Sequence, residues 1–266
     1  MRIVIMMGSH PRHNYVAEQL IQTGKVVGYL VEKRESFVPA PPKHLAEQDK
    51  ANFIRHFNDR DQSERAMFPA SIHIPDSVSV RHVTIDQLNS QETIEWLQSL
   101  QADVLISYGV HKLSRELLAD APAHAWNIHG GLSPWYRGTT TLFWPFYMLQ
   151  PNWAGMTIHR LSDKLDAGDI LHHAVPTLEY GDGIHDVANK AVKQAAEDLC
   201  YILEHFELEQ LNYVPQKTAG KLFLSSEWKP EHLRVIYQLF NNDIVDRYLD
   251  GELPHVEPPL VRAYEC

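Results

Sequence analysis

Residues 3–31 read IVIMMGSHPRHNYVAEQLIQTGKVVGYLV. Within this stretch, residues 3–7 and 26–31 are short continuous apolar runs, which is typical of the buried strands of a parallel sheet. The segment between them carries apolar side chains at helical spacing, at Val16, Leu20 and Ile21. The stretch therefore predicts a strand, a helix and a second strand, the unit from which doubly wound sheets are built.

The same alternation continues along the chain. Further strands are expected at 78–84, 104–106, 125–129, 154–160 and 168–175, and helices at 44–67, 85–100, 139–149 and 184–206. The pattern predicts an α/β protein with a Rossmann-like, doubly wound and mostly parallel sheet. It changes near residue 217, so we predict a main domain over residues 1–216 and a small C-terminal appendage over 217–266.

Composition narrows the function classes. Hydrophobic residues make up 44% and charged residues 22% of the 266 residues, as in globular proteins. The net charge, 24 − 34 = −10, disfavours a nucleic-acid partner. With Cys200 and Cys266 as the two cysteines, neither a disulfide framework nor a thiolate metal cluster is expected, and the apolar N-terminal run is too short for a signal peptide or a membrane span. We predict a cytoplasmic protein without a membrane partner.

Asn127 and His129 carry the first candidate chemistry. They lie two residues apart at the end of a predicted strand, so their side chains share a face, while Trp126 and Ile128 point into packing. In open parallel sheets, ligands bind beyond the carboxyl ends of the strands. An amide donor beside an imidazole suits acyl chemistry, in which an oxyanion needs a donor and a proton needs an acceptor. The alternative is a structural pair that satisfies loop backbone groups.

A set of segments around this pair resembles the folate-dependent formyltransferase family, which includes glycinamide ribonucleotide, methionyl-tRNA and nucleotide-sugar N-formyltransferases. The segments are Asn127-Ile-His129, Leu132-Ser-Pro-Trp-Tyr-Arg-Gly138, Thr157-Ile-His159 and Leu165-Asp-Ala-Gly-Asp169. The matching block spans about residues 103 to 175. Family members commonly have Ser-Leu-Leu-Pro after the histidine, whereas this chain has Gly-Gly-Leu-Ser-Pro over residues 130–134, which leaves the acceptor open.

The resemblance implies a formyltransferase catalytic domain that uses N10-formyltetrahydrofolate as co-substrate and no metal. It also implies a catalytic trio of Asn127, His129 and Asp166, in which Asn127 and His129 stabilise the developing oxyanion and Asp166 orients His129. Taken alone, Asp166 reads as a turn residue. The residues that the resemblance assigns to donor binding are Tyr108, Gly109, Val110, Leu161, Ser162, Asp163 and Leu165.

The class of formyl acceptor is inferred by excluding the acceptors of other family members. The segment after residue 217 is short and acidic in places, which disfavours tRNA, and purine-pathway relatives do not need the helical excursion over 43–68. A nucleotide-linked amino sugar remains. We expect Ser9, His10 or Arg12 to contact a phosphate, and the alternative is a polar helix cap. Further expected contacts are an aromatic platform at Trp135 and Tyr136, which core packing would also explain, and a pyrophosphate contact at Arg137.

Other readings stay open at this point. A metal hydrolase could draw its ligands from His124, His129, Asp166 and His172 or His173, but no helical histidine spacing supports it and adjacent strand residues face opposite ways. The formyl group could instead go to water, as in formyltetrahydrofolate hydrolases, or to a different small amine. A binding module without turnover is the non-enzymatic alternative. The apolar run at 222–224 suggests a homodimer contact.

Overall fold

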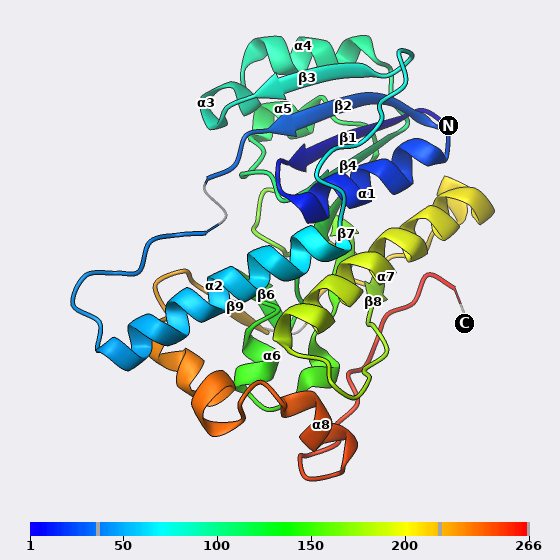
Figure 1. The fold of residues 1–266 in the computed structure, drawn as a ribbon. Coiled ribbons are helices and arrows are strands. Elements are labelled where there is room, and N and C mark those ends of the chain that lie inside the picture. Colours follow the sequence, from blue (N-terminus) through cyan, green and yellow to red (C-terminus); the bar gives the residue numbers. More distant parts are fainter. Residues whose placement is uncertain (36–37, 218–219, 265–266) are drawn as a thin grey trace.

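The computed structural model describes residues 1–35, 38–217 and 220–264, so Cys266 lies outside the described part of the chain. A seven-stranded sheet forms its centre, with strand order β3-β2-β1-β4-β5-β7-β8 (Figure 1). The first five strands of the chain pair in parallel, and β7 runs antiparallel to both of its neighbours. The prediction of a Rossmann-like, mostly parallel α/β fold is confirmed. The strands are β1 (Ile3–Gly8), β2 (Val26–Glu32), β3 (Ser79–Val83), β4 (Val104–Tyr108), β5 (His124–His129), β7 (Met156–Arg160) and β8 (Ile170–Ala174).

Helices cover both faces of the sheet. Ile3, Ile5 and Met7 of β1 belong to the hydrophobic cluster that includes α1 (Pro11–Gln22) and α7 (Ile184–His205). The alternate residues of β1 pack with the helices of the opposite face, as the two-residue period of a strand requires. Those helices are α3 (Ile85–Leu88), α4 (Gln91–Ser99) and α5 (Arg115–Ala119). Within the described residues, no helix has the length and apolar character needed to cross a bilayer.

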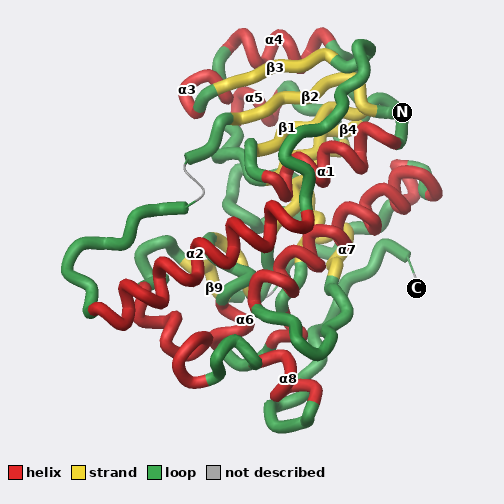
Figure 2. The backbone as a smooth tube through the Cα atoms, in the orientation of Figure 1, coloured by secondary structure: helices red, strands yellow, loops and turns green. Residues whose placement is uncertain are grey.

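A second hydrophobic cluster lies beyond the sheet, where helices and loops predominate (Figure 2). It joins Phe53 of α2 (Glu47–Met67) and Phe143 to Phe223 and Ile236 of the C-terminal segment. Two short strands, β6 (Tyr136–Gly138) and β9 (Lys221–Phe223), pair in parallel within it. The C-terminal segment thus shares a core with the rest of the chain, and the domain boundary after residue 216 stays a prediction. The remaining elements are α6 (Trp144–Tyr147), α8 (Ile244–Leu249) and the single turns Pro151–Trp153, Leu208–Gln210, Pro230–His232 and Val235–Leu239.

Two predicted helices are shorter than expected. The helix expected over 139–149 is confined to α6, because the run of β-branched threonines before it is a poor helix former and Thr140 adopts a left-handed φ of 58°. The helix expected over 85–100 is divided in two at Ser90, whose hydroxyl accepts a hydrogen bond from the backbone N–H of Thr93 and caps α4.

Leu222 and Leu224 are 40% and 52% exposed, and the homodimer contact there stays a prediction.

Two consecutive histidines of β8 are hydrogen-bonded to the C-terminal segment. The Nδ1 atoms of His172 and His173 accept hydrogen bonds from the backbone N–H groups of Ala263 and Val261, at 3.1 and 2.9 Å. His173 also donates from Nε2 to the carbonyl oxygen of Ser133, at 2.8 Å. Burial lowers the pKa of His173 from its ordinary value of 6.5 to about 4, so the ring is neutral and able to accept at neutral pH.

This arrangement predicts an acid-sensitive fold. Because the pKa of His173 is lower in the folded chain than in the unfolded chain, its stabilising effect is present above pH 6.5 and is lost as the pH falls towards 4. We expect the free energy of unfolding to fall by about 3 kcal/mol from this group over that range. Urea denaturation at pH 7.5 and pH 5 measures it. His173→Gln should flatten the pH dependence, whereas the exposed control His44→Gln should not, and equal slopes for the two variants would contradict the assignment.

Candidate functional site

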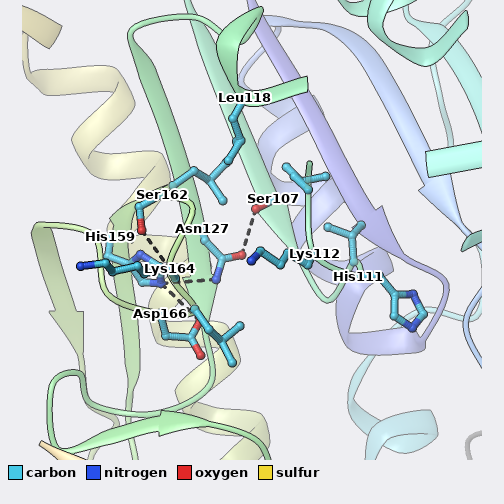
Figure 3. A pocket seen from close by; sticks show the side chains of 13 residues that line it. Ser107, His111, Lys112, Leu118, Asn127, His159, Ser162, Lys164 and Asp166 are labelled. Carbon is cyan, nitrogen blue, oxygen red and sulfur yellow. Dashed lines mark hydrogen bonds and ion pairs between the residues drawn. The ribbon is translucent and has the colours of Figure 1, made fainter. Parts of the chain in front are cut away.

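The candidate site lies at the carboxyl end of β5, where Asn127 and His129 face the same side, while Trp126 and Ile128 are buried on the other. The Ser107 hydroxyl of the neighbouring strand β4 donates to Oδ1 of Asn127 at 2.9 Å. This bond fixes the amide, so that its Nδ2 points towards Nε2 of His159, at 3.4 Å (Figure 3). Asn127 therefore presents a donor group in a set orientation.

Two contacts define the state of His129. Its Nε2 donates to the carbonyl oxygen of Tyr136 at 2.8 Å, and its Nδ1 faces Oδ1 of Asp166 at 3.4 Å. Because a carbonyl only accepts, Nε2 carries the proton, and Nδ1 is the atom that gains or loses one. Burial lowers the pKa of His129 below its usual value, although the Asp166 carboxylate opposes this effect. At neutral pH the ring is uncharged and can accept a proton at Nδ1.

Asp166 reaches this pair from the loop between β7 and β8, with a left-handed φ of 47°. The backbone N–H of Gly138 donates to its Oδ2 at 2.9 Å, and Nε2 of His159 lies 3.6 Å from its Oδ1. Burial alone raises the pKa of Asp166, but the interactions with His129, His159 and Gly138 outweigh it and hold the pKa below the usual value. The structure thus brings together the three residues of the predicted trio, with an ionised carboxylate beside a neutral imidazole.

Two cavities flank the trio. Asn127 and Asp166 border the first, of about 120 Å³, and His129 borders the second, of about 380 Å³. The first is lined by Ser107, Val110, His111, Lys112, Leu113, Leu118, His159, Leu161, Ser162, Lys164 and Leu165 (Figure 3). The second is lined among others by Arg12, His13, His56, Arg60, Glu64, Tyr108, Gly109, Phe143, His185 and Asn189. A group transferred between molecules in the two cavities would pass the trio.

The predicted donor-binding residues divide between these cavities. Val110, Leu161, Ser162 and Leu165 line the first cavity, whereas Tyr108 and Gly109 line the second. Asp163 borders neither, and its carboxylate pairs with Arg115 at 2.9 Å.

The predicted acceptor-binding residues are more scattered. Arg12 lines the second cavity, but the hydroxyl of Ser9 accepts from the backbone of Arg34 at 2.9 Å and His10 contacts the backbone of Glu35. Trp135, Tyr136 and Arg137 border neither cavity. Trp135 packs on Trp153, Tyr136 stacks on Phe223, and Arg137 donates to the Gly220 carbonyl. The pairing of β6 with β9 places Trp135 and Tyr136 in the second hydrophobic cluster. Contact of these two residues and of Arg137 with an acceptor stays a prediction.

The sequence analysis missed a group of polar residues on the wall of the second cavity. His56, Arg60 and Glu64 come from α2, and His185 and Asn189 come from α7, which packs beside α2. The available signal was the spacing of four residues between His56, Arg60 and Glu64, which places them on one helical face. From the sequence, residues 43–68 were predicted only as a helical segment, with no site residue among them.

A buried glutamate holds the loop beside the first cavity. The Glu32 side chain is 0% exposed, and its two oxygens accept from the backbone N–H of His111 at 2.8 Å and from its Nδ1 at 2.6 Å. On the solvent side, the exposed Glu35 pairs with Nε2 of His111 at 3.1 Å. Glu32 therefore links the end of β2 to a residue that lines the cavity.

The two glutamates form a matched pair for a stability measurement. Glu32→Gln removes the charge from a buried, hydrogen-bonded group, and we expect it to lower the free energy of unfolding by about 2 kcal/mol. Glu35→Gln changes a solvated partner of the same imidazole and should cost less than about 0.5 kcal/mol. Urea denaturation of both variants measures the difference. A smaller effect at Glu32 than at Glu35 would show that the buried contact does not hold the loop.

The described residues contain no group of three histidine, cysteine, aspartate or glutamate side chains placed to hold a metal ion. His172 and His173 contact the C-terminal segment, and His124 contacts the hydroxyl of Tyr213. Of the ligand set considered from the sequence, His129 and Asp166 lie together, whereas His124, His172 and His173 make these separate contacts.

Known proteins share the fold of this chain. A family model described as formyl transferase matches residues 29–203. A 4-N formyltransferase from Francisella tularensis superposes with a TM-score of 0.55 at 15% identity, over 85% of this chain and 78% of that one. Phosphoribosylglycinamide formyltransferase from Anaplasma phagocytophilum gives a TM-score of 0.52 at 17% identity, over 84% and 96%. The formyltransferase PseJ from Anoxybacillus kamchatkensis, in complex with UDP-4,6-dideoxy-4-formamido-L-AltNAc and tetrahydrofolate, gives 0.50 at 16% identity, over 91% and 95%. These similarities show a shared fold.

Proposed function

The chain belongs to the formyl transferase family, and on this premise we propose that it transfers a formyl group from N10-formyltetrahydrofolate to the amino group of a nucleotide-linked amino sugar. One observation carries the proposal. Asn127, His129 and Asp166 lie between two cavities, so that a donor in one and an acceptor in the other would meet at these side chains. A hydrolase needs no second cavity of this size, because water is its acceptor.

The first cavity suits the donor. Its walls carry Leu113, Leu118 and Leu161, and Ser107 and Asn127 contribute polar groups. Flat heteroaromatic rings bind in such sites, where apolar walls enclose the ring and a few polar groups orient it. Bound there, the donor would supply the formyl carbon next to Asn127. The PseJ structure, which contains tetrahydrofolate, supports this choice of donor.

The trio supplies the chemistry around that carbon. The bond from the amine nitrogen to the formyl carbon forms, the bond from that carbon to N10 breaks, and the proton lost by the amine ends on N10. As negative charge develops on the formyl oxygen, the Nδ2 of Asn127 donates a hydrogen bond to it. His129 accepts a proton at Nδ1 and Asp166 stabilises the resulting cation. Because Nε2 of His129 already donates to Tyr136, we assign His129 to proton transfer and Asn127 to the oxyanion.

The second cavity supports a large, anionic acceptor. Its volume of about 380 Å³ exceeds what a small amine fills, and Arg12 and Arg60 give its wall positive charge. A nucleotide-linked amino sugar has both the size and the phosphates that such a cavity suits. PseJ, a relative of the same fold, was solved with a UDP-linked formamido sugar.

Product analysis tests the proposal. The enzyme is incubated with N10-formyltetrahydrofolate and a panel of nucleotide-linked amino sugars, with glycinamide ribonucleotide and a buffer-only reaction as the alternatives. We expect mass spectrometry to detect a formamide of one or more of the nucleotide sugars. Formylated glycinamide ribonucleotide alone would assign a different acceptor. Formate in the reaction without an amine would identify a hydrolase.

A further inference from the structure

The inner face of α2 carries polar side chains as well as the apolar Phe53. His56, Arg60 and Glu64, which we call the polar stripe, follow one another at intervals of four residues and line the second cavity. His56 is 6% and Glu64 3% exposed. A helix on a protein surface normally buries an apolar stripe, and burying charged groups costs free energy unless other groups compensate. A polar face turned inward is therefore more typical of a binding surface than of a packing surface.

The charged half of the stripe favours an anion. Oε1 of Glu64 accepts from Arg12 at 2.8 Å, whereas its Oε2 is buried and has no hydrogen-bond partner within the described part of the chain. Burial and the nearby Arg12 lower the pKa of Arg60 to about 10. Among the residues that line the cavity, Arg12 and Arg60 each carry a guanidinium and Glu64 carries the carboxylate, so the lining has a net positive charge. A phosphate bound between the guanidinium groups would relieve their repulsion.

The other half of the stripe is uncharged. Nδ1 of His56 lies 2.9 Å from the hydroxyl of Tyr237, which lies 3.4 Å from Nε2 of His185. Burial lowers the pKa of His185 to about 3 and that of His56 well below its usual value. Since Nδ1 of His56 contacts Tyr237, Nε2 is the nitrogen that can bind a ligand, and a hydroxyl group, which both donates and accepts, can pair with it in either tautomer. This half is suited to an uncharged, hydroxyl-bearing part of a ligand.

We infer that the polar stripe of α2 determines acceptor specificity. Arg60, together with Arg12, binds phosphate oxygens of the acceptor, and His56 binds a hydroxyl of its sugar. The inference rests on the proposed function, since it takes the molecule in the second cavity to be the formyl acceptor. It adds helix α2 to the regions that the sequence connected with the acceptor, which were residues 9–12 and the segment after β5.

Arg60→Gln and Arg65→Gln test the stripe as a matched pair. Both remove a guanidinium from α2, but Arg65 is 64% exposed and pairs with Asp61 on the outer side. We expect Arg60→Gln to raise the KM for the nucleotide-linked amino sugar by about 10- to 100-fold, with smaller changes in kcat and in the KM for the donor. Arg65→Gln should leave all three unchanged. Arg60→Lys, which keeps the charge but loses the two-pronged geometry, should lie between them.

A binding measurement separates this inference from the proposed function. Inorganic pyrophosphate should raise the melting temperature of the unaltered enzyme and of Arg65→Gln, but not that of Arg60→Gln, and circular dichroism verifies the folding of each variant. An equal response of the two variants, or none in the unaltered enzyme, would overturn the inference. If no amine is formylated while the pyrophosphate response still requires Arg60, the proposed function fails and the anion site stands.

His56→Phe tests the uncharged half. It keeps a ring of similar shape but removes both nitrogens, so the KM for the nucleotide-linked amino sugar should rise about 5- to 50-fold while the pyrophosphate response persists. Unchanged acceptor KM in this variant would remove His56 from the recognition surface.

Discussion

His129→Ala is expected to lower kcat by about 10²- to 10⁴-fold, the usual contribution of a side chain that transfers a proton in the transition state. Nε2 of His129 is committed to the Tyr136 carbonyl, and Nδ1, next to Asp166, is left to receive the proton of the attacking amine. Because burial keeps the pKa of His129 below its usual value, the ring is a neutral base at pH 7. Activity of the unaltered enzyme should therefore persist to below pH 6.5 before it declines.

The control lies on the same strand. His124 also belongs to β5 but contacts the hydroxyl of Tyr213 away from both cavities, so His124→Ala should retain kcat within about twofold. Steady-state kinetics of the two variants, with folding checked by circular dichroism, gives the comparison. If His129→Ala kept most of its turnover, proton transfer would have to be assigned to another group.

Asp166→Asn should have an effect of similar size, about 10²- to 10⁴-fold on kcat, for a different reason. The amide is nearly isosteric and can still accept from the backbone N–H of Gly138, so the loop keeps its shape. What is lost is the negative charge that stabilises protonated His129. Since Asp166 raises the pKa of His129, its removal should lower that pKa further and move the acid limb of the pH–rate profile to lower pH.

The pH profile distinguishes this role from a structural one. A variant that merely disturbed the loop would lose activity without a shift of the acid limb. Asp120→Asn, a change at a surface carboxylate that accepts from Gln98, is the control and should alter neither quantity. NMR titration of His129 in the unaltered and Asp166→Asn proteins measures the pKa directly, and a pKa that rises in the variant would contradict the proposed coupling.

The sheet and the shared face of Asn127 and His129 could be predicted from the sequence because both depend on local pattern. A short apolar run that ends at turn residues, such as residues 3–7 before Gly8 and Ser9, is typical of a buried strand. The two-residue spacing of Asn127 and His129 places them on one face of their strand. The approach of Asp166 to His129 is not local, since it requires the loop after β7 to cross the end of β5. The family resemblance, rather than spacing, indicated that contact.

The residues that line the second cavity were harder to predict from the sequence, for a physical reason. A polar stripe on a helix looks the same in sequence whether it faces water or a cavity, and only the packing of α2 on α7 determines which. Likewise, Trp135 and Tyr136 follow β5 closely in the sequence, which suggested that they face the site. The pairing of residue 136 with residue 221 instead places both side chains in the second hydrophobic cluster. Contacts between segments that are distant in the sequence, α2 with α7 and β6 with β9, therefore determine which side chains face the second cavity.

In the proposed reaction, a formyl group passes between the two cavities at Asn127, His129 and Asp166. Release of tetrahydrofolate from N10-formyltetrahydrofolate, followed with and without a panel of nucleotide-linked amino sugars, tests it most directly when the Asn127→Ala/His129→Ala double variant is run alongside. We predict release that depends on the acceptor and is abolished in the double variant. Release of equal rate without any acceptor, or release that survives in the double variant, would contradict the account.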